Sequence, residues 1–441
     1  MLVVGAGLSG LAVAARLARL RHEVTVLERT SGPGGAAGRL ERDGFGFDLG
    51  PSLVHLPAAY RDLFVKTGKN APLESLLELR PVPTAVRWEF ADGTSVDLPN
   101  ASRAGTMDAL SAALGASAAD QWDRFIATGD EVWAQFRQGF LAGPLPPAQG
   151  WRAGRAGRAA HATLHPAKSY ADLMDRHLKD QRLRQAGGSY LRRLGSDPDR
   201  APATAVLWPW LEQTFGAWEV VGGIGVLVDA IAERARLRGA ELRYDTEVIG
   251  IDTADGAVRG VRTADGTTLP ADVVVAAVDD VAVDRWCSGS VPTPGERSDS
   301  AVVLLLALRE GPAVPNIVSF PAEPRSSDPT LFLSPAQAPE GNTGLTVIAP
   351  GARQATAIIG VLDARGHQIS ERLLWHEIRQ SAAMVGPAVH GRDALRRAPN
   401  ATTVSGLFHV GSAAHPGPGV DLAPLGGALV AEYLGRARPG N

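Results

Sequence analysis

The chain has 441 residues, a formal net charge of −3 and a single cysteine, Cys287. This length predicts two or three domains of ordinary size rather than one core. The charge balance argues against nucleic acid as a partner, and one cysteine excludes an internal disulfide framework and a cysteine-based metal cluster. We therefore expect a cytoplasmic globular protein that acts on small or apolar molecules.

The first thirty residues predict a strand, a turn, a helix and a second strand. Residues 1–5 have the pattern of a buried strand, and in residues 8–20, LSGLAVAARLARL, the apolar side chains recur every three to four positions, as in a helix. Residues 23–29, EVTVLER, alternate as a strand. This order is typical of a unit with parallel strands that binds a dinucleotide.

The turn between the first strand and the helix carries a glycine motif. Gly5, Gly7 and Gly10 form G-x-G-x-x-G, in which glycine permits the tight turn and lets a pyrophosphate approach the backbone amides. Glu28 ends the second strand, where a carboxylate can accept both ribose hydroxyls of an adenosine. The alternative is a turn that only packs the helix against the strand.

In the remaining chain, segments with helical patterns alternate with segments of short strands. A hairpin pattern and helical patterns around 107–138 and 168–194 are followed by short strands with Asp-Gly turns, and then by the strand candidates VVLLLAL, PTLFLS, GLTVIAP and QATAIIGVL. We therefore predict an α/β protein with two interwoven domains. The nucleotide-binding domain is expected to comprise 1–75, 219–285 and 401–441, and a mixed α+β substrate-binding domain 76–218 and 286–400.

Residues 151–168, rich in arginine, glycine and alanine, predict a surface loop, and a basic patch that contacts a membrane is the alternative. His161 and His165 have the spacing of two metal ligands on a helix, but no acidic third ligand accompanies them, so we expect no metal site. No apolar run approaches the roughly 20 residues of a transmembrane helix.

Several stretches together resemble the phytoene desaturase family, which belongs to the larger group of FAD-dependent amine oxidases and protoporphyrinogen oxidases. At the amino end these are VVGAGLSGLAVAARL, VTVLER, GPGG and GRLERDGFGFDLGPSLV. Further along they are GAWEVVGGIGVLVDAIAERARLRGAELRYDTEVIGI, ADVVVAAVDD and GLFHVGSAAHPGPGV, in the family's order. The resemblance implies a Rossmann-type FAD-binding domain woven with a substrate-binding domain.

The resemblance also implies which residues hold FAD. Gly411 and Ser412 would contact the pyrophosphate and ribityl chain, and Val420 would lie beside the isoalloxazine ring. Ala36 stands where the family usually has Lys or Arg. The resemblance therefore leaves the contact of a basic side chain with the pyrophosphate to Arg39 alone. The full set is Gly5, Gly7, Gly10, Glu28, Gly34, Gly35, Arg39, Gly50, Pro51, Ser52, Val248, Gly411, Ser412, Gly419 and Val420.

The implied activity is dehydrogenation, or isomerisation, of an apolar polyene or terpenoid-like substrate, with oxygen or a quinone as electron acceptor. Peripheral contact with a membrane is a hypothesis that rests on the solubility of such a substrate. A flavin amine oxidase is an alternative, although HPGPGVDLAP has neither the covalent-flavin cysteine nor the aromatic cage expected there. A flavin- or lipid-binding protein without turnover is another.

Three residues are candidates for acid–base catalysis. Glu212 lies within the apolar stretch LWPWLEQTFGAW, where burial raises a carboxyl pKa toward a catalytic range. His55 and His415 lie in loops expected near the flavin. The alternatives are a salt bridge for Glu212 and backbone hydrogen bonds for the histidines. Asp421 is expected to cap the last helix, and the alternative is a carboxylate that lies close to the flavin.

Overall fold

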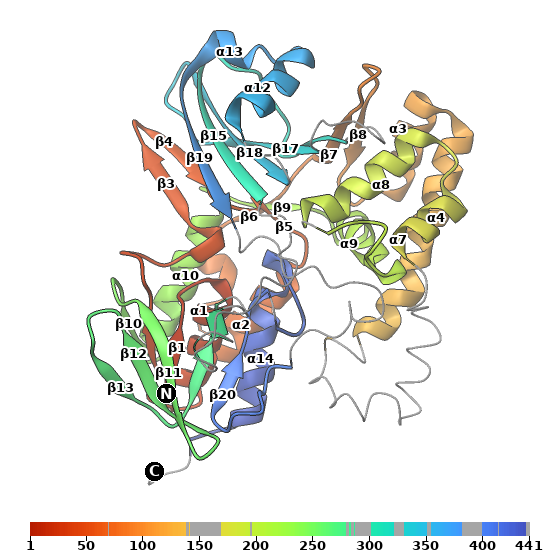
Figure 1. Cartoon of the computed structure of the whole chain (residues 1–441). Helices are drawn as coiled ribbons and strands as arrows, with labels where there is room; N and C mark the ends of the chain where they lie inside the picture. The colour runs from red at the N-terminus through yellow and green to blue at the C-terminus, as the bar shows by residue number, and fades with distance from the viewer. Residues whose placement is uncertain are drawn as a thin grey trace.

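The computed structural model describes residues 1–68, 70–137, 141, 169–194, 196–278, 282–283, 286, 301–321, 330–350, 354–381, 399–412 and 414–437. The predicted loop 151–168, with His161 and His165, lies outside the described residues, as does Cys287. Figure 1 shows a sheet flanked by helices in the lower half of the molecule, a larger sheet at the top and a group of helices at the right.

A parallel sheet of five described strands forms the lower half and confirms the predicted α/β fold. Its strands are joined in the order β10, β2, β1, β14 and β20, and every neighbouring pair is parallel. These strands span Glu241–Arg243, Thr25–Leu27, Leu2–Val4, Val274–Ala276 and Leu407–His409. Segments from the beginning, the middle and the end of the chain therefore share one sheet.

The strands of this sheet are buried on both faces, as is usual for parallel sheets. On one face Val3, Val26 and Val275 pack against the helices α1 (Leu8–Arg19), α2 (Pro57–Thr67), α10 (Ile224–Leu237) and α14 (Ala423–Leu434). On the other face Val4 and Ala276 pack against the antiparallel strands β11 (Val248–Ala254), β12 (Ala257–Thr263) and β13 (Thr268–Pro270). The alternation of side chains along a strand produces this division.

The second large sheet contains seven described strands in the order β19, β15, β18, β17, β16, β7 and β8. They span Leu373–Ser381, Ala301–Arg309, Asn342–Pro350, Leu331–Ala336, Val318–Phe320, Thr84–Glu89 and Ser95–Pro99. The strands predicted from VVLLLAL, PTLFLS and GLTVIAP are confirmed as β15, β17 and β18. The strand predicted from QATAIIGVL is wrong, because this stretch is helix α12 (Ala355–Ala364).

Helix α12 illustrates why a short apolar run is ambiguous. Its buried residues Ile358, Ile359 and Leu362 recur at a helical spacing, and together with the short helix α13 (Ile369–Arg372) it covers one face of the sheet (Figure 1). Alanines at 355 and 357 favour the helix, since alanine has the highest helix propensity. The apolar content was read correctly, but its period was not.

A group of helices packs beside strands β7 and β8, at the right of Figure 1. The rings of Trp88 on β7 and Trp122 on helix α4 (Ala116–Phe136) meet edge to face, with centroids 5.0 Å apart. The predicted helical regions around 107–138 and 168–194 are confirmed. The helices are α3 (Arg103–Leu114), α4 (Ala116–Phe136), α7 (Tyr170–His177), α8 (Gln181–Arg193) and α9 (Leu207–Phe215).

Short strands connect the two halves of the molecule. The hairpin of β3 (Arg39–Arg42) and β4 (Phe45–Asp48) follows the first glycine segments. Strand β9 (Trp218–Val220) pairs with both β5 (Leu53–Val54) and β6 (Leu79–Pro81). Short 3-10 turns lie at Gly35–Ala37, Leu73–Ser75, Ala203–Val206 and Val420–Leu422.

Candidate active site

Three of the predicted cofactor positions follow the carboxyl ends of parallel strands. Gly5 follows β1, Glu28 follows β2, and Gly411 lies two residues beyond β20. Because the strands run in one direction, these ends meet at one edge of the sheet. Open α/β sheets bind their ligands at this edge.

The first turn of the chain has a geometry that requires glycine. Gly5 has φ +102°, and a Cβ at Gly10 would lie 2.0 Å from the carbonyl oxygen of Gly5. Helix α1 begins after Gly7 without a capping side chain or an acidic residue in its first turn. Its first amides are thus available to an anion, and the turn fits a pyrophosphate group.

A second glycine segment packs directly on this turn. The amide of Gly34 donates to the carbonyl of Ala6 at 2.9 Å, and a Cβ at Gly35 would lie 3.4 Å from Cα of Gly7. At Gly50 a Cβ would lie 2.2 Å from the carbonyl oxygen of Ala36. Pro51 and Ser52 directly follow this close backbone contact in the sequence. Such close backbone approach forms a cradle of glycines at the sheet edge.

Glu28 is buried beside this cradle and has local hydrogen-bond partners. Its Oε2 accepts from the Ala6 amide at 2.8 Å, and its Oε1 accepts from the amide and hydroxyl of Thr30. The amide of Thr246 donates to the Glu28 carbonyl at 2.8 Å, which brings the chain near Val248 to the same place. The carboxylate is therefore fixed where an adenosine ribose is expected.

Arg39 and Asp48 hold the β3–β4 hairpin against the glycine pair that precedes α10. Arg39 Nη1 donates to the carbonyl of Gly222 at 2.8 Å, and both carboxyl oxygens of Asp48 lie 3.1 Å from the amide of Ile224. Burial raises the pKa of Asp48 above its ordinary value, and the amide hydrogen bond opposes this effect. The contact of Arg39 with a pyrophosphate stays a prediction.

The carboxyl-terminal loop that follows β20 is fastened by Asn400, which sequence reasoning missed. Its buried side-chain amide donates to the carbonyls of His409, at 3.0 Å, and of His415, at 2.7 Å, and so spans Gly411 and Ser412. His415 is completely buried. Asn400 belongs to none of the recognised motifs, so nothing in the sequence indicated that it holds this loop.

The same loop then approaches helix α9. Gly419 has φ +105°, and a Cβ there would lie 3.4 Å from the ring of Trp208 on α9. The hydroxyl of Tyr60 on α2 donates to the Val420 carbonyl at 2.7 Å. Helix α14 starts at Ala423, so a helix follows residue 420 as predicted.

Two of the three predicted catalytic residues, His55 and Glu212, meet in one buried network. His55 Nε2 lies 3.5 Å from Glu212 Oε2, and His55 Nδ1 lies 3.2 Å from Asp421 Oδ2. Glu212 also accepts from the Tyr190 hydroxyl at 2.5 Å and has Arg193 Nη2 at 3.6 Å. We call Asp421, His55, Glu212, Tyr190 and Arg193 the buried network.

The predicted capping of the last helix by Asp421 is wrong. Helix α14 has Leu422 at its N-cap and no capping side chain. Asp421 Oδ1 instead accepts from the amides of His55, at 2.6 Å, and Leu56, at 2.7 Å, just before α2 begins. The partner amides are 365 and 366 residues away, so local sequence could not reveal them.

The two carboxylates set the protonation of His55. Burial by itself lowers the pKa of His55, but Asp421 and Glu212 outweigh it and raise the pKa to about 9. Burial acts to raise the pKa of Asp421 and Glu212, yet His55 holds both below their ordinary values. The raised pKa predicted for Glu212 is therefore wrong, because sequence reasoning did not see its cationic partners. His55 is therefore a cation near neutral pH.

A parallel sheet with a G-x-G-x-x-G turn and a buried glutamate at its edge defines a dinucleotide-binding α/β protein. The family of flavin containing amine oxidoreductases matches residues 8–287, more than half of the chain. The chain belongs to this family and is a flavin-dependent oxidoreductase.

Relatives confirm the resemblance to carotenoid desaturases. Hydroxyneurosporene desaturase of Cereibacter sphaeroides is 30% identical over 98% of this chain and 97% of that protein. The 4,4'-diapolycopene oxygenase of a Methylomonas species is 26% identical over 98% of this chain and 97% of that protein. The crystal structure of an oxidoreductase from Methanosarcina mazei shares the fold, with a TM-score of 0.68 at 18% identity, over 98% of this chain and 99% of that one.

The described helices include none with the length and apolar character needed to span a membrane. Among the described residues there is also no group of three or more His, Cys, Asp or Glu side chains arranged to hold a metal ion.

Proposed function

We propose that this protein is an FAD-dependent dehydrogenase of CH–CH bonds in apolar polyenes. The proposal is carried by the cradle of Gly5, Gly7, Gly10, Gly34 and Gly35 in a chain that matches a hydroxyneurosporene desaturase from end to end. That match covers 98% of this chain and 97% of the relative, so it is not limited to the residues at the sheet edge.

The residues proposed to hold FAD are those at the sheet edge and in the carboxyl-terminal loop. Buried Glu28 is the partner of the ribose, and the amides that begin α1 are partners of the pyrophosphate. FAD, when bound, supplies the hydride acceptor for the reaction. The set is Gly5, Gly7, Gly10, Glu28, Gly34, Gly35, Arg39, Gly50, Pro51, Ser52, Val248, Gly411, Ser412, Gly419 and Val420.

Dehydrogenation removes a hydride from one carbon and a proton from its neighbour, and the electron pair of the second C–H bond becomes the new double bond. A weak base suffices where a polyene delocalises the developing cation. His55 is already protonated near neutral pH, which leaves Glu212 and His415 as candidates for the proton acceptor. Glu212 Oε2 has no hydrogen bond to the described residues, but it faces His55 Nε2 at 3.5 Å and Arg193 Nη2 at 3.6 Å, and these cations hold its pKa below the ordinary value.

The reduced cofactor is proposed to pass its electrons to oxygen or a quinone. Since polyenes partition into lipid, we also propose a cytoplasmic location with peripheral membrane contact. Sedimentation of the purified protein with liposomes tests this contact, and a protein that stays in the supernatant contradicts it.

The visible spectrum of the purified protein tests the cofactor. We expect a yellow protein that binds FAD, and we expect Gly10→Ala to be colourless because its Cβ collides with the Gly5 carbonyl. Gly32→Ala is the matched control, since its Cβ position has no atom within 4 Å among the described residues. A colourless wild-type protein that cannot be reconstituted with FAD contradicts the proposal.

Anaerobic addition of substrates tests the reaction. We expect phytoene or hydroxyneurosporene to bleach the flavin absorbance and putrescine to leave it unchanged. Bleaching by the amine alone identifies an amine oxidase. A flavin that no probe reduces identifies a binding protein without turnover.

A further inference from the structure

The buried network joins parts of the chain that belong to opposite sides of the candidate site. Asp421 directly follows Val420 in the carboxyl-terminal loop, and His55 lies between β5 and α2. Glu212 belongs to α9, while Tyr190 and Arg193 belong to α8. A chain of contacts thus runs from the loop proposed to meet the flavin to the helices beside β7 and β8.

The geometry around His55 favours an imidazolium. A neutral imidazole donates from one ring nitrogen only, yet Nδ1 faces the carboxylate of Asp421 and Nε2 faces that of Glu212. The side chain of His55 is 11% exposed, and those of Asp421 and Glu212 are 7% and 1% exposed. Two carboxylates this deeply buried need the cation between them.

Among the described residues, the other charged and titratable side chains around this group are Arg193, Tyr60 and Tyr190, and each is compatible with a protonated His55. Arg193 balances the second carboxylate, so the two cations and two anions sum to zero. The hydroxyls of Tyr60 and Tyr190 complete the surroundings. Burial, reinforced by Asp421 and Glu212, holds the pKa of both tyrosines well above their usual value, and they stay neutral.

The network also fixes where the carboxyl-terminal loop lies. Asp421 Oδ1 is held by two backbone amides, and its Oδ2 by His55, so the carboxylate cannot swing away without breaking three contacts. On the same stretch, Gly419 lies against Trp208, one turn of α9 before Glu212. The loop and α9 are therefore joined at two neighbouring points.

We propose that His55 is a positioning residue which, as an imidazolium, fastens the Gly419–Val420 loop to helix α9 and so sets the distance between substrate and flavin. Loss of its proton sets two buried carboxylates against each other and weakens the link between the loop and α9, while the two backbone amides still hold Asp421. This inference rests on the proposed function. Rates of transfer between bound groups are sensitive to such displacements, since about 1 Å can cost ~100-fold.

The test compares wild type, His55→Gln and Asp421→Asn, all loaded with FAD, with His367→Gln as control. His367 pairs with Glu89 at 2.9 Å and has the same 11% exposure as His55, but it joins the turn after α12 to β7. The visible flavin spectrum is recorded from pH 6 to pH 10 without substrate. We expect a transition near pH 9 in wild type and His367→Gln, and none in His55→Gln.

The second measurement is the anaerobic rate of flavin reduction by hydroxyneurosporene or phytoene over the same pH range. In wild type we expect the rate to fall above pH 9. In His55→Gln and Asp421→Asn we expect it to be about tenfold or more lower and nearly independent of pH, with little change in the polyene concentration at half saturation. His367→Gln should match wild type.

Nitrogen NMR of histidine-labelled wild-type holoprotein keeps the test decisive if the variants fold poorly. A doubly protonated His55 at pH 7 supports the proposal, and a neutral one overturns it. A spectral transition that persists in His55→Gln also overturns it. If no polyene reduces the flavin but the transition is present and lost in His55→Gln, the dehydrogenase assignment fails while the fastening by His55 stands.

Discussion

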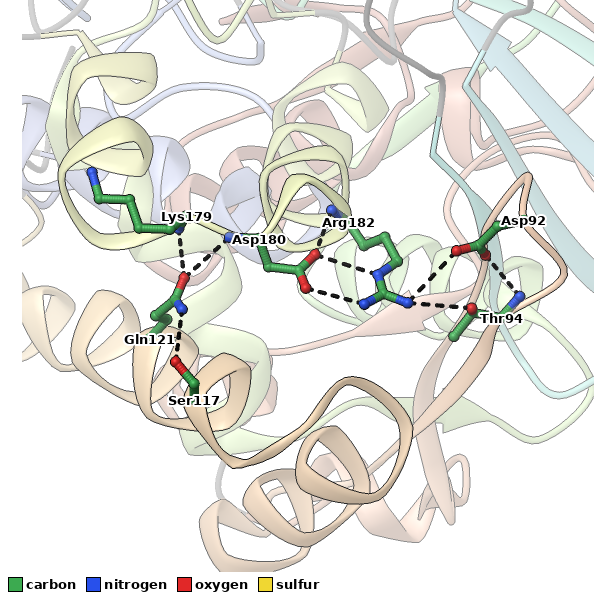
Figure 2. Close-up of polar contacts among 7 residues, drawn as sticks. All are labelled: Asp92, Thr94, Ser117, Gln121, Lys179, Asp180 and Arg182. Atoms are coloured by element: carbon green, nitrogen blue, oxygen red, sulfur yellow. Dashed lines mark hydrogen bonds and ion pairs between the residues drawn. The ribbon is translucent and has the colours of Figure 1, made fainter.

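Two polar networks link separate elements of this protein, and they differ in burial. Figure 2 shows the exposed one, in which Arg182 on α8 contacts Asp180 at the start of the same helix and Asp92 in the β7–β8 turn. The side chains of Arg182 and Asp92 are 31% and 52% exposed, whereas Glu212 of the buried network is 1% exposed. Water competes for every contact of the first network and for few of the second.

The difference decides how much each network contributes to stability. An exposed ion pair contributes about 0–1 kcal/mol, because water and salt screen the charges and long side chains lose entropy. A buried pair has a large desolvation cost, so removal of one partner leaves an uncompensated charge. Ion pairs with similar contact distances therefore differ in how much stability is lost when one partner is removed. The following substitutions test that difference.

The largest effect is expected from His55→Ala, which leaves Asp421 and Glu212 buried without a cation. We expect the free energy of unfolding to fall by about 3–5 kcal/mol. Urea denaturation at pH 7, followed by flavin absorbance and by far-ultraviolet circular dichroism, measures the loss. A decrease as small as that expected below for Arg182→Gln would contradict the assigned role of burial.

The pH dependence of stability follows from the raised pKa of His55, about 9 in the folded protein against an ordinary 6.5. The folded state binds the proton more tightly, so this contribution is complete below pH 6.5 and is lost as pH rises through 9. It amounts to about 3 kcal/mol. Urea titrations between pH 6 and 10 should show this slope in wild type. Parallel curves for wild type and His55→Ala would refute it.

A smaller effect is expected from Tyr190→Phe, which removes the hydroxyl that donates to Glu212 at 2.5 Å. A hydrogen bond to a charged group contributes about 1.5–3 kcal/mol, so we expect a loss of about 2 kcal/mol. Tyr170→Phe is the matched control, because that buried hydroxyl donates at 3.0 Å to the neutral carbonyl of Gly187. Thermal melts of the two variants should rank Tyr190→Phe as the less stable.

The smallest effect is expected from Arg182→Gln, which breaks the exposed network. We expect a loss below about 1 kcal/mol at low salt. At 1 M salt the Debye length falls to about 3 Å, so the difference from wild type should vanish. Urea denaturation in both salts measures it. A loss that persists at 1 M salt would show that geometry rather than charge holds Arg182.

The parts of the fold that local chemistry determines were predicted from sequence. The first strand, the helix after it and the three glycines of the turn depend on apolar period and on backbone freedom within twenty residues. The error at residues 354–362 arose because a short run of Ala, Ile, Val and Leu satisfies a buried strand and a buried helix equally. Packing against the seven-stranded sheet decided it.

The sequence predicted residues of the candidate site but not the contacts between them. Glu212 and His55 were identified as titratable side chains in an apolar segment and a loop. Their contact with each other and with Asp421 joins residues more than 150 positions apart, and no periodicity encodes it. Asp421 was misread for the same reason, since proximity in sequence favoured its own helix.

The position of β20 has a consequence for biosynthesis. This strand completes the edge of the parallel sheet beside β14, and helix α14 packs so closely on α1 that a Cβ at Gly427 would lie 2.8 Å from the backbone nitrogen of Val13. A nascent chain that has not yet reached residue 434 therefore exposes one apolar flank of its first helix. Closure of that flank must wait until translation of α14 is complete.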